Sequence, residues 1–150
     1  MKFTIINGPS LSYLGSREPE IYGKKTLSDL QVMLNKAKAK DETLYFVQSN
    51  SEGELIDEIL WTQHKFTDGL IINPGAYAHY SYAMYDALRA IDIPKVEVHL
   101  TDIMKREDFR KNLVTAQACD YLIYGHGFDG YVEAMQWIRG ELKNDKRRKK

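Results

Sequence analysis

The sequence predicts one α/β domain built on a five-stranded parallel sheet with helices on both faces. Three observations support this: five short apolar runs, helical segments between them, and a length of 150 residues, which fits one hydrophobic core. The apolar runs are rich in β-branched and aromatic residues and are continuous, which is typical of strands buried on both faces. We therefore expect a three-layer sandwich over residues 1–142 with the common strand order 2-1-3-4-5.

Each apolar run is assigned to one strand. The five runs are Phe3–Ile6, Leu44–Val47, Leu70–Ile72, Val96–Leu100 and Tyr121–Tyr124. The first helix follows a predicted capping box of Thr26 and Asp29. Three later helices are expected over Glu52–His64, Ser81–Ile91 and Gly130–Leu142. Asp102–Ala118 has weak periodicity and is expected to be a loop with a short helix. Its basic residues face either an anionic ligand or solvent: Lys105, Arg106, Arg110 and Lys111.

Composition excludes several classes of protein. The 21 basic and 21 acidic residues give a formal charge of zero, which argues against a protein that coats nucleic acid. Residues 143–150 hold six basic residues and one acidic residue, so residues 1–142 carry −5; the end is predicted to be a disordered basic tail. The single cysteine excludes an internal disulfide and suits a cytoplasmic protein. No apolar run approaches the roughly 20 residues of a membrane helix, so no membrane partner is expected.

The predicted strand order places a ligand site. In open parallel sheets, ligands bind at the carboxyl ends of the strands where the strand order reverses. That edge collects three polar segments, Asn7–Gly15, Asn73–Ser81 and Glu97–Asp102. Their chemically capable residues are Asn7, Ser10, Asn73, His79, Glu97, His99 and Thr101.

Glu97 and His99 share one face of the fourth strand because they alternate with apolar residues. A carboxylate that orients an imidazole for proton transfer is the favoured interpretation. A purely structural pair is the alternative. A metal site that adds His79 is disfavoured because the spacing matches no strong metal motif, so no metal is predicted.

The loop Gly15–Gly23 has glycine at both ends, which suits a hinged lid over the first strand. Its capable residues are Arg17 and Tyr22. A cation beside a phenol stabilises the phenolate, so Arg17 could prepare Tyr22 to act as a base. A surface loop with a packing tyrosine is the simpler alternative.

Five segments of the chain carry a family pattern. They are INGPSLSYLGSREPEIYG (6–23), QSNSEGELID (48–57), INPGAYAHYS (72–81), EVHLTDIMKREDFR (97–110) and GFDGY (127–131). In order and spacing they resemble the type II 3-dehydroquinate dehydratases. The resemblance implies a flavodoxin-like fold, a dodecamer of four trimers, and no metal or other cofactor. It also implies trans elimination of water from 3-dehydroquinate to give 3-dehydroshikimate, a step of the shikimate pathway.

The resemblance also implies residue roles. Tyr22 matches the general base, Arg17 the lid arginine beside it, His99 the general acid and Glu97 its orienting carboxylate. The positions that match substrate ligands are Asn73, His79, Arg110 and the backbone N–H groups of Leu100 and Thr101. Asp86 matches an acidic residue offered by a neighbouring subunit, and Arg106 falls on a basic position of its segment.

The chain departs from the family pattern at several positions. Ser10 stands where the family has an asparagine that holds a water against the enolate oxygen, and Ser12 replaces a second asparagine. Thr101–Met104 and Asn112–Ala116 also differ. Losing a preorganised enolate contact costs roughly 2–4 kcal/mol, so reduced activity is expected. Two alternatives remain: a non-catalytic homologue that binds a quinate-like ligand or a protein, and, more weakly, a phosphate or FMN site beside Ser10, Ser12 and Ser16.

Overall fold

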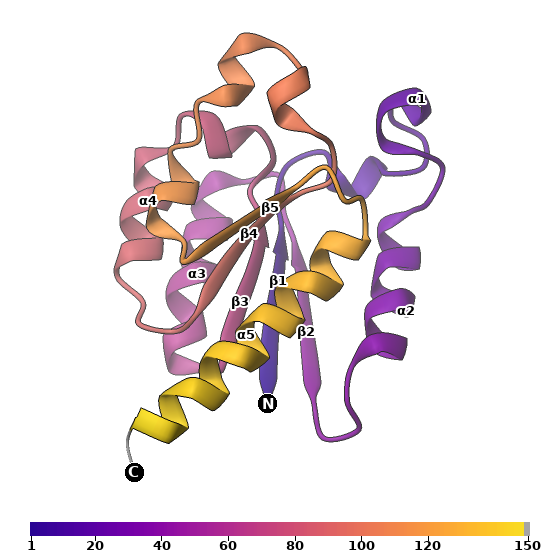
Figure 1. Cartoon of the computed structure of the whole chain (residues 1–150). Coiled ribbons are helices and arrows are strands. Elements are labelled where there is room, and N and C mark those ends of the chain that lie inside the picture. Colours follow the sequence, from indigo (N-terminus) through magenta and orange to yellow (C-terminus); the bar gives the residue numbers. More distant parts are fainter. Residues whose placement is uncertain (149–150) are drawn as a thin grey trace.

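Five parallel strands form the central sheet in the order β2-β1-β3-β4-β5 (Figure 1). The computed structural model describes residues 1–148 and confirms the predicted fold class and strand order. The strands are β1 (Lys2–Asn7), β2 (Thr43–Gln48), β3 (Gly69–Asn73), β4 (Lys95–His99) and β5 (Tyr121–Tyr124). Each predicted strand differs from the observed strand by at most one residue at either end.

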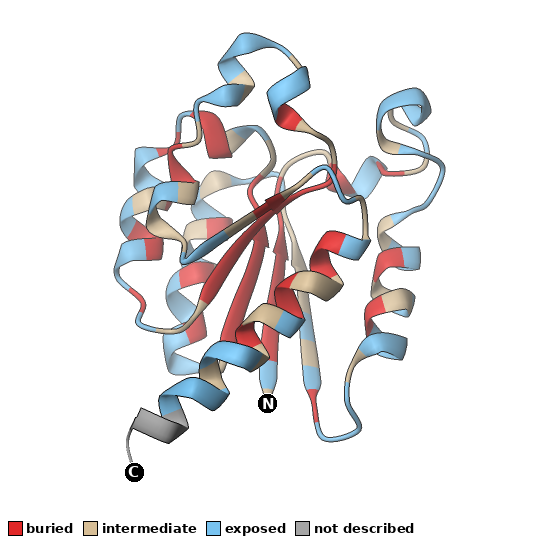
Figure 2. Cartoon of the chain, viewed as in Figure 1, coloured by how far each residue is buried: buried red, intermediate tan, exposed pale blue. Residues whose placement is uncertain are grey.

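Helices cover both faces of the sheet (Figure 1). Helices α2 (Leu27–Ala37) and α5 (Asp129–Arg148) cover one face, where their apolar residues join one buried cluster with Phe3, Ile5 and Val98. Helices α3 (Glu52–His64) and α4 (Tyr82–Arg89) cover the other face around Ile6 and Ile72. Figure 2 shows the middle strands buried between these layers, as the continuous apolar runs predict.

Local signals set most helix boundaries. The predicted capping box is confirmed at α2, where the Asp29 backbone N–H donates to Thr26 Oγ1 at 3.1 Å and the Thr26 N–H donates to Asp29 Oδ2 at 2.8 Å. Helix α5 differs from its prediction, because it continues past residue 142 to Arg148. Residues 143–148 include no Gly or Pro, and basic residues are favoured at a helix C-terminus. Six of the eight residues predicted as a tail are therefore helical, and residues 149 and 150 lie outside the described residues.

The segments beyond the strands are short and tightly turned. They comprise α1 (Pro19–Tyr22) and the 3₁₀ turns η1 (Leu11–Tyr13), η2 (Gly75–His79), η3 (Ile103–Lys105), η4 (Asp108–Lys111) and η5 (Thr115–Ala118). Gly8 allows the loop after β1 to pass close to the loop after β3, since a Cβ there would lie 2.5 Å from the Pro74 carbonyl oxygen. The Gly8 N–H donates to the Asn73 carbonyl at 2.8 Å. These loops therefore meet at the predicted edge of the sheet.

Candidate active site

A cavity of about 120 Å³ lies at the carboxyl ends of β1, β3 and β4. The structure brings nine of the predicted site residues to its wall: Ser10, Arg17, Tyr22, Asn73, His79, His99, Leu100, Thr101 and Arg110. The strand-order rule therefore located the pocket from the sequence alone. Asn7 is not on this wall; its Oδ1 accepts a hydrogen bond of 2.6 Å from the buried Tyr131 phenol.

Glu97 and His99 form a buried pair, of which His99 lines the pocket. His99 Nε2 lies 2.7 Å from Glu97 Oε1, and the Glu97 residue is fully buried. The other carboxylate oxygen, Oε2, accepts a hydrogen bond of 2.6 Å from the Thr115 hydroxyl. The oxygens of an ionised carboxylate only accept hydrogen bonds, so His99 donates from Nε2. The other ring nitrogen, Nδ1, is then available to a ligand in the pocket.

His79 is held by the backbone of the segment after η4. Its Nδ1 lies 2.8 Å from the Asn112 carbonyl oxygen, and the Asn112 side-chain amide donates to the His79 carbonyl at 3.0 Å. Because a carbonyl only accepts, Nδ1 carries the proton and Nε2 presents a lone pair. Burial lowers the pKa of His79, which favours the neutral ring. The His79 and His99 rings stack with centroids 6.1 Å apart.

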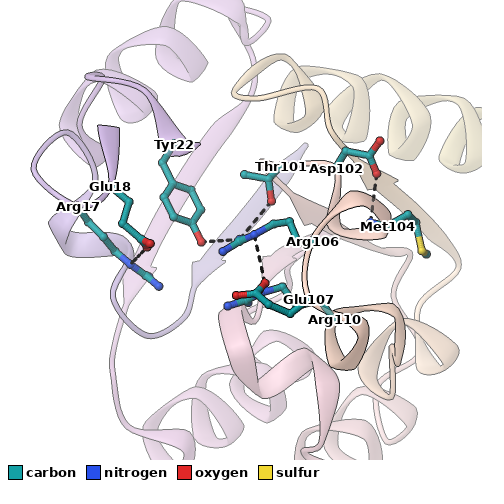
Figure 3. A network of polar contacts seen from close by, with 9 residues as sticks. All are labelled: Arg17, Glu18, Tyr22, Thr101, Asp102, Met104, Arg106, Glu107 and Arg110. Carbon is teal, nitrogen blue, oxygen red and sulfur yellow. Dashed lines mark hydrogen bonds and ion pairs between the residues drawn. The ribbon is translucent and has the colours of Figure 1, made fainter. Parts of the chain in front are cut away.

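The Tyr22 phenol lies between two arginines, as Figure 3 shows. Arg106 Nη1 donates to Tyr22 Oη at 2.7 Å, and its guanidinium lies 5.3 Å from the ring centroid. Arg17 lies over the same ring at 5.1 Å, and its Nε pairs with Glu18 at 3.4 Å. Arg17 was the cation predicted to act on this phenol, but in this structure Arg106 is the one that donates to the phenol oxygen, while Arg17 lies over the ring face.

The Glu107 carboxylate pairs with two arginines, Arg106 and Arg110 (Figure 3). Glu107 Oε2 lies 2.6 Å from Arg110 Nε and 3.7 Å from Arg106 Nε. The hydrogen bond from Arg110 holds the pKa of Glu107 below its ordinary value. Arg106 also reaches Thr101 Oγ1 at 3.4 Å. The basic residues of this segment therefore have two different surroundings: Arg106 and Arg110 line the pocket, whereas Lys105 faces solvent.

Ser10 adopts a backbone conformation that is uncommon for serine. Its φ of 66° and ψ of −2° lie in the left-handed region, which Asn tolerates better than other side-chain-bearing residues do. Asn50 Oδ1 accepts from the Ser10 N–H at 3.0 Å and fixes this turn. Across the pocket, Asn73 Oδ1 accepts from the Gly75 N–H at 3.1 Å, so Asn73 is both a turn residue and a pocket residue.

Both glycines that bound the predicted lid, residues 15–23, have positive φ angles. Gly15 has a φ of 91° and Gly23 a φ of 78°, values that favour glycine. Between them, α1 carries Tyr22 on its last turn. Hinge motion itself stays a prediction.

Asp86 stands apart from the pocket of its own chain. It is exposed on α4 and is absent from the pocket wall. The sequence reasoning did not single out Thr115 or Asn112, and it gave Arg106 no contact with Tyr22. The only sequence signal for Arg106 was its place in a basic cluster. Thr115 and Asn112 gave no signal, because they lie in a segment without periodicity.

Metal-ligating clusters and membrane-spanning helices are both absent from the described residues. No group of three or more His, Cys, Asp or Glu side chains there could hold a metal ion. Within residues 1–148, no helix is long and apolar enough to cross a membrane.

The pocket combines a phenol bonded to a cation, an imidazole backed by a buried carboxylate, and further guanidinium groups. Such a set can remove a proton from carbon, deliver a proton to a leaving group and hold an anion.

Comparisons with known proteins identify the family of this chain. The family model for class II dehydroquinase matches residues 1–139. A 3-dehydroquinate dehydratase of Clostridium botulinum (strain Okra / Type B1) is 46% identical over 143 residues, which span 95% of this chain and 97% of that protein. The type II dehydroquinase of Butyrivibrio crossotus has a similar structure, with a TM-score of 0.90, 44% identity and coverage of 93% of this chain and 97% of that one. The Propionibacterium acnes type II dehydroquinase gives a TM-score of 0.87 at 35% identity, over 91% of this chain and 94% of that one. The chain therefore belongs to the class II dehydroquinase family.

Proposed function

We propose that this chain is a hydro-lyase that converts 3-dehydroquinate to 3-dehydroshikimate by trans elimination of water through an enolate. The observation that carries the proposal is the placement of the Tyr22 phenol and the His99 imidazole on the wall of one pocket. The curated relative named above carries the matching activity in its name.

Tyr22 is the base that removes the proton from the carbon next to the ketone. Arg106, 2.7 Å from the phenol oxygen, stabilises the phenolate by a charge-assisted hydrogen bond. Arg17, over the ring face, adds a second favourable charge. Both contacts favour proton removal by the phenol oxygen, because a nearby positive charge stabilises a phenolate.

His99 is the acid that protonates the departing hydroxyl. Glu97, fully buried behind it, orients the ring and stabilises the imidazolium that donates the proton. The chemistry requires this second proton transfer because hydroxide is a poor leaving group.

The substrate is an anion with several hydroxyl groups, and the remaining pocket residues suit it. The His79 Nε2 lone pair accepts a hydrogen bond from a substrate hydroxyl, and the Asn73 side-chain NH₂ donates one. Arg110 adds a positive charge, and the backbone N–H groups of Leu100 and Thr101 cradle the carboxylate. Ser10 holds the enolate-side water less firmly than asparagine does, which lowers the rate.

The family resemblance adds an assembly to the proposal. The active unit is a cytoplasmic dodecamer of four trimers, in which Asp86 of a neighbouring subunit completes the pocket. The exposure of Asp86 on α4 supports this, because an exposed residue is available to a neighbour. Sedimentation equilibrium should give twelve times the 17.4 kDa mass of one chain; a monomer would remove the role of Asp86.

The test of the activity is direct. Purified protein is mixed with 3-dehydroquinate, and the conjugated enone of the product is followed by its ultraviolet absorbance. We expect turnover by the natural chain and none by Tyr22→Phe. Binding of the substrate, seen as thermal stabilisation, without turnover would favour the non-catalytic homologue instead.

A further inference from the structure

Residues 112–115, here called the strap, contact the parts of the chain that carry both pocket histidines. The strap runs from the end of η4 into η5 and crosses beside η2 and β4. It is also one of the segments in which the sequence departs from its family pattern. The strap has no helical or strand periodicity, but its contacts assign it a role in positioning the two histidines.

At one end the strap fixes His79. The Asn112 carbonyl accepts from His79 Nδ1 at 2.8 Å, and the Asn112 amide returns a hydrogen bond of 3.0 Å to the His79 carbonyl. Two residues on, the Val114 N–H donates to the Ala78 carbonyl at 2.8 Å. Three hydrogen bonds thus lock η2 against the strap.

At the other end the strap fixes His99 through Glu97. Thr115 is fully buried, and its hydroxyl lies 2.6 Å from Glu97 Oε2. The opposite oxygen of that carboxylate lies 2.7 Å from His99 Nε2. Without the Thr115 hydroxyl, Oε2 keeps no hydrogen-bond donor among the described residues, and an unpaired buried carboxylate oxygen is costly. The carboxylate would then rotate or take up a proton, and either change would weaken its hold on His99.

We propose that Thr115 is a positioning residue and that the strap sets which ring nitrogen of each histidine faces the pocket. Thr115 orders the Glu97 carboxylate, so that His99 is the Nε2–H tautomer with Nδ1 toward the pocket. Asn112 makes His79 the Nδ1–H tautomer with Nε2 toward the pocket. The kinetic consequence rests on the proposed function; the tautomers do not.

The first experiment reads the tautomers directly. Protein labelled with ¹⁵N at its histidines is examined by NMR at pH 8, where the ring nitrogen shifts separate N–H from lone-pair nitrogens. The natural chain should show His99 as Nε2–H and His79 as Nδ1–H. His99 as Nδ1–H would overturn the proposal without any variant or any turnover.

The second experiment removes the hydroxyl. Thr115→Val should lose the single His99 tautomer, leave the His79 signals in place, and lower kcat by about tenfold or more with KM within about twofold. Thr115→Ser keeps the donor and should restore both the tautomer and kcat. Thr62→Val is the matched control, since Thr62 is a buried threonine whose hydroxyl donates to the Ile59 carbonyl at 2.6 Å, on α3. It should change neither readout.

Three results would contradict the proposal: Thr115→Val with normal kcat and tautomers, Thr115→Ser as impaired as Thr115→Val, or loss of both histidine signals together. If the natural chain has no turnover, the proposed activity fails while the NMR arm still decides the role of Thr115. If Thr115→Val does not fold, the tautomers of the natural chain and of Thr115→Ser decide it.

Discussion

Ser10→Asn should change both the stability of the fold and the rate of turnover, and a control variant separates the two effects. Its φ of 66° places it in the left-handed region, which costs an L-residue about 1–2 kcal/mol. Asparagine is several-fold enriched there, which corresponds to roughly 1 kcal/mol. Ser10→Asn should therefore raise the free energy of unfolding by about 0.5–1 kcal/mol.

The same substitution should restore an amide to the pocket wall. A lost enolate-side contact costs a factor of about 10²–10³ in rate, and the serine hydroxyl recovers part of it. Ser10→Asn should accordingly raise kcat by about 10- to 100-fold. Ser10→Gly is the matched control, because glycine relieves the backbone but supplies no hydrogen-bonding side chain.

Two measurements decide between the outcomes. Urea denaturation gives the stability, and enone absorbance gives kcat. For Ser10→Gly we expect a stability within about 0.5 kcal/mol of the natural chain, since glycine also adds entropy to the unfolded state, and a lower kcat. If Ser10→Asn stabilises the fold but leaves kcat unchanged or lower, the loop has adapted to serine and the reasoning about the enolate water is wrong.

Other predictions test the pocket cations and the pH dependence of the fold. Arg106→Met should lower kcat by about 10²-fold, whereas Lys105→Met, at an exposed neighbouring position, should leave it unchanged in the same assay. Glu42→Gln should cost about 1–3 kcal/mol in urea denaturation at pH 7, because it breaks a buried bidentate pair with Arg139. The hydrogen bond from Arg139 lowers the pKa of Glu42, so this difference should persist above about pH 4.5 and shrink as the pH falls further; an equal difference at pH 3 would contradict it. Burial lowers the pKa of His79, so the natural chain should lose stability as the pH falls from about 6.5 to 5 while His79→Gln loses less, as thermal unfolding at each pH will show.

Much of the fold was predictable because its signals are local. Strands β1, β3 and β4 are almost fully buried, so their apolar runs are continuous and easy to locate. The strand-order rule selected seven residues at the sheet edge, and five of them line one pocket: Ser10, Asn73, His79, His99 and Thr101. The end of α5 was missed because residues 143–148 hold no apolar residue, so the periodicity that locates the helix stops at Leu142 although the helix continues.

The contacts inside the site were less predictable because they join distant segments. Arg17 lies five positions from Tyr22 in the chain and was the natural candidate to contact its phenol oxygen. The arginine that does so is Arg106, which is 84 positions away. Thr115 is separated from Glu97 by 18 positions and lies in a segment without periodicity, so nothing local indicated their hydrogen bond. Such pairs follow from how loops fold over the sheet edge, which residue spacing does not encode.

The central claim is that Tyr22 removes a proton on the face opposite to the departing hydroxyl. The most direct measurement uses 3-dehydroquinate deuterated at only one of the two hydrogens of the carbon next to the ketone, with the product analysed by mass spectrometry. A label anti to the hydroxyl should be lost by the natural chain and a syn label retained, and Tyr22→Phe should give no product. Loss of the syn label, or turnover by Tyr22→Phe equal to that of the natural chain, would contradict the account.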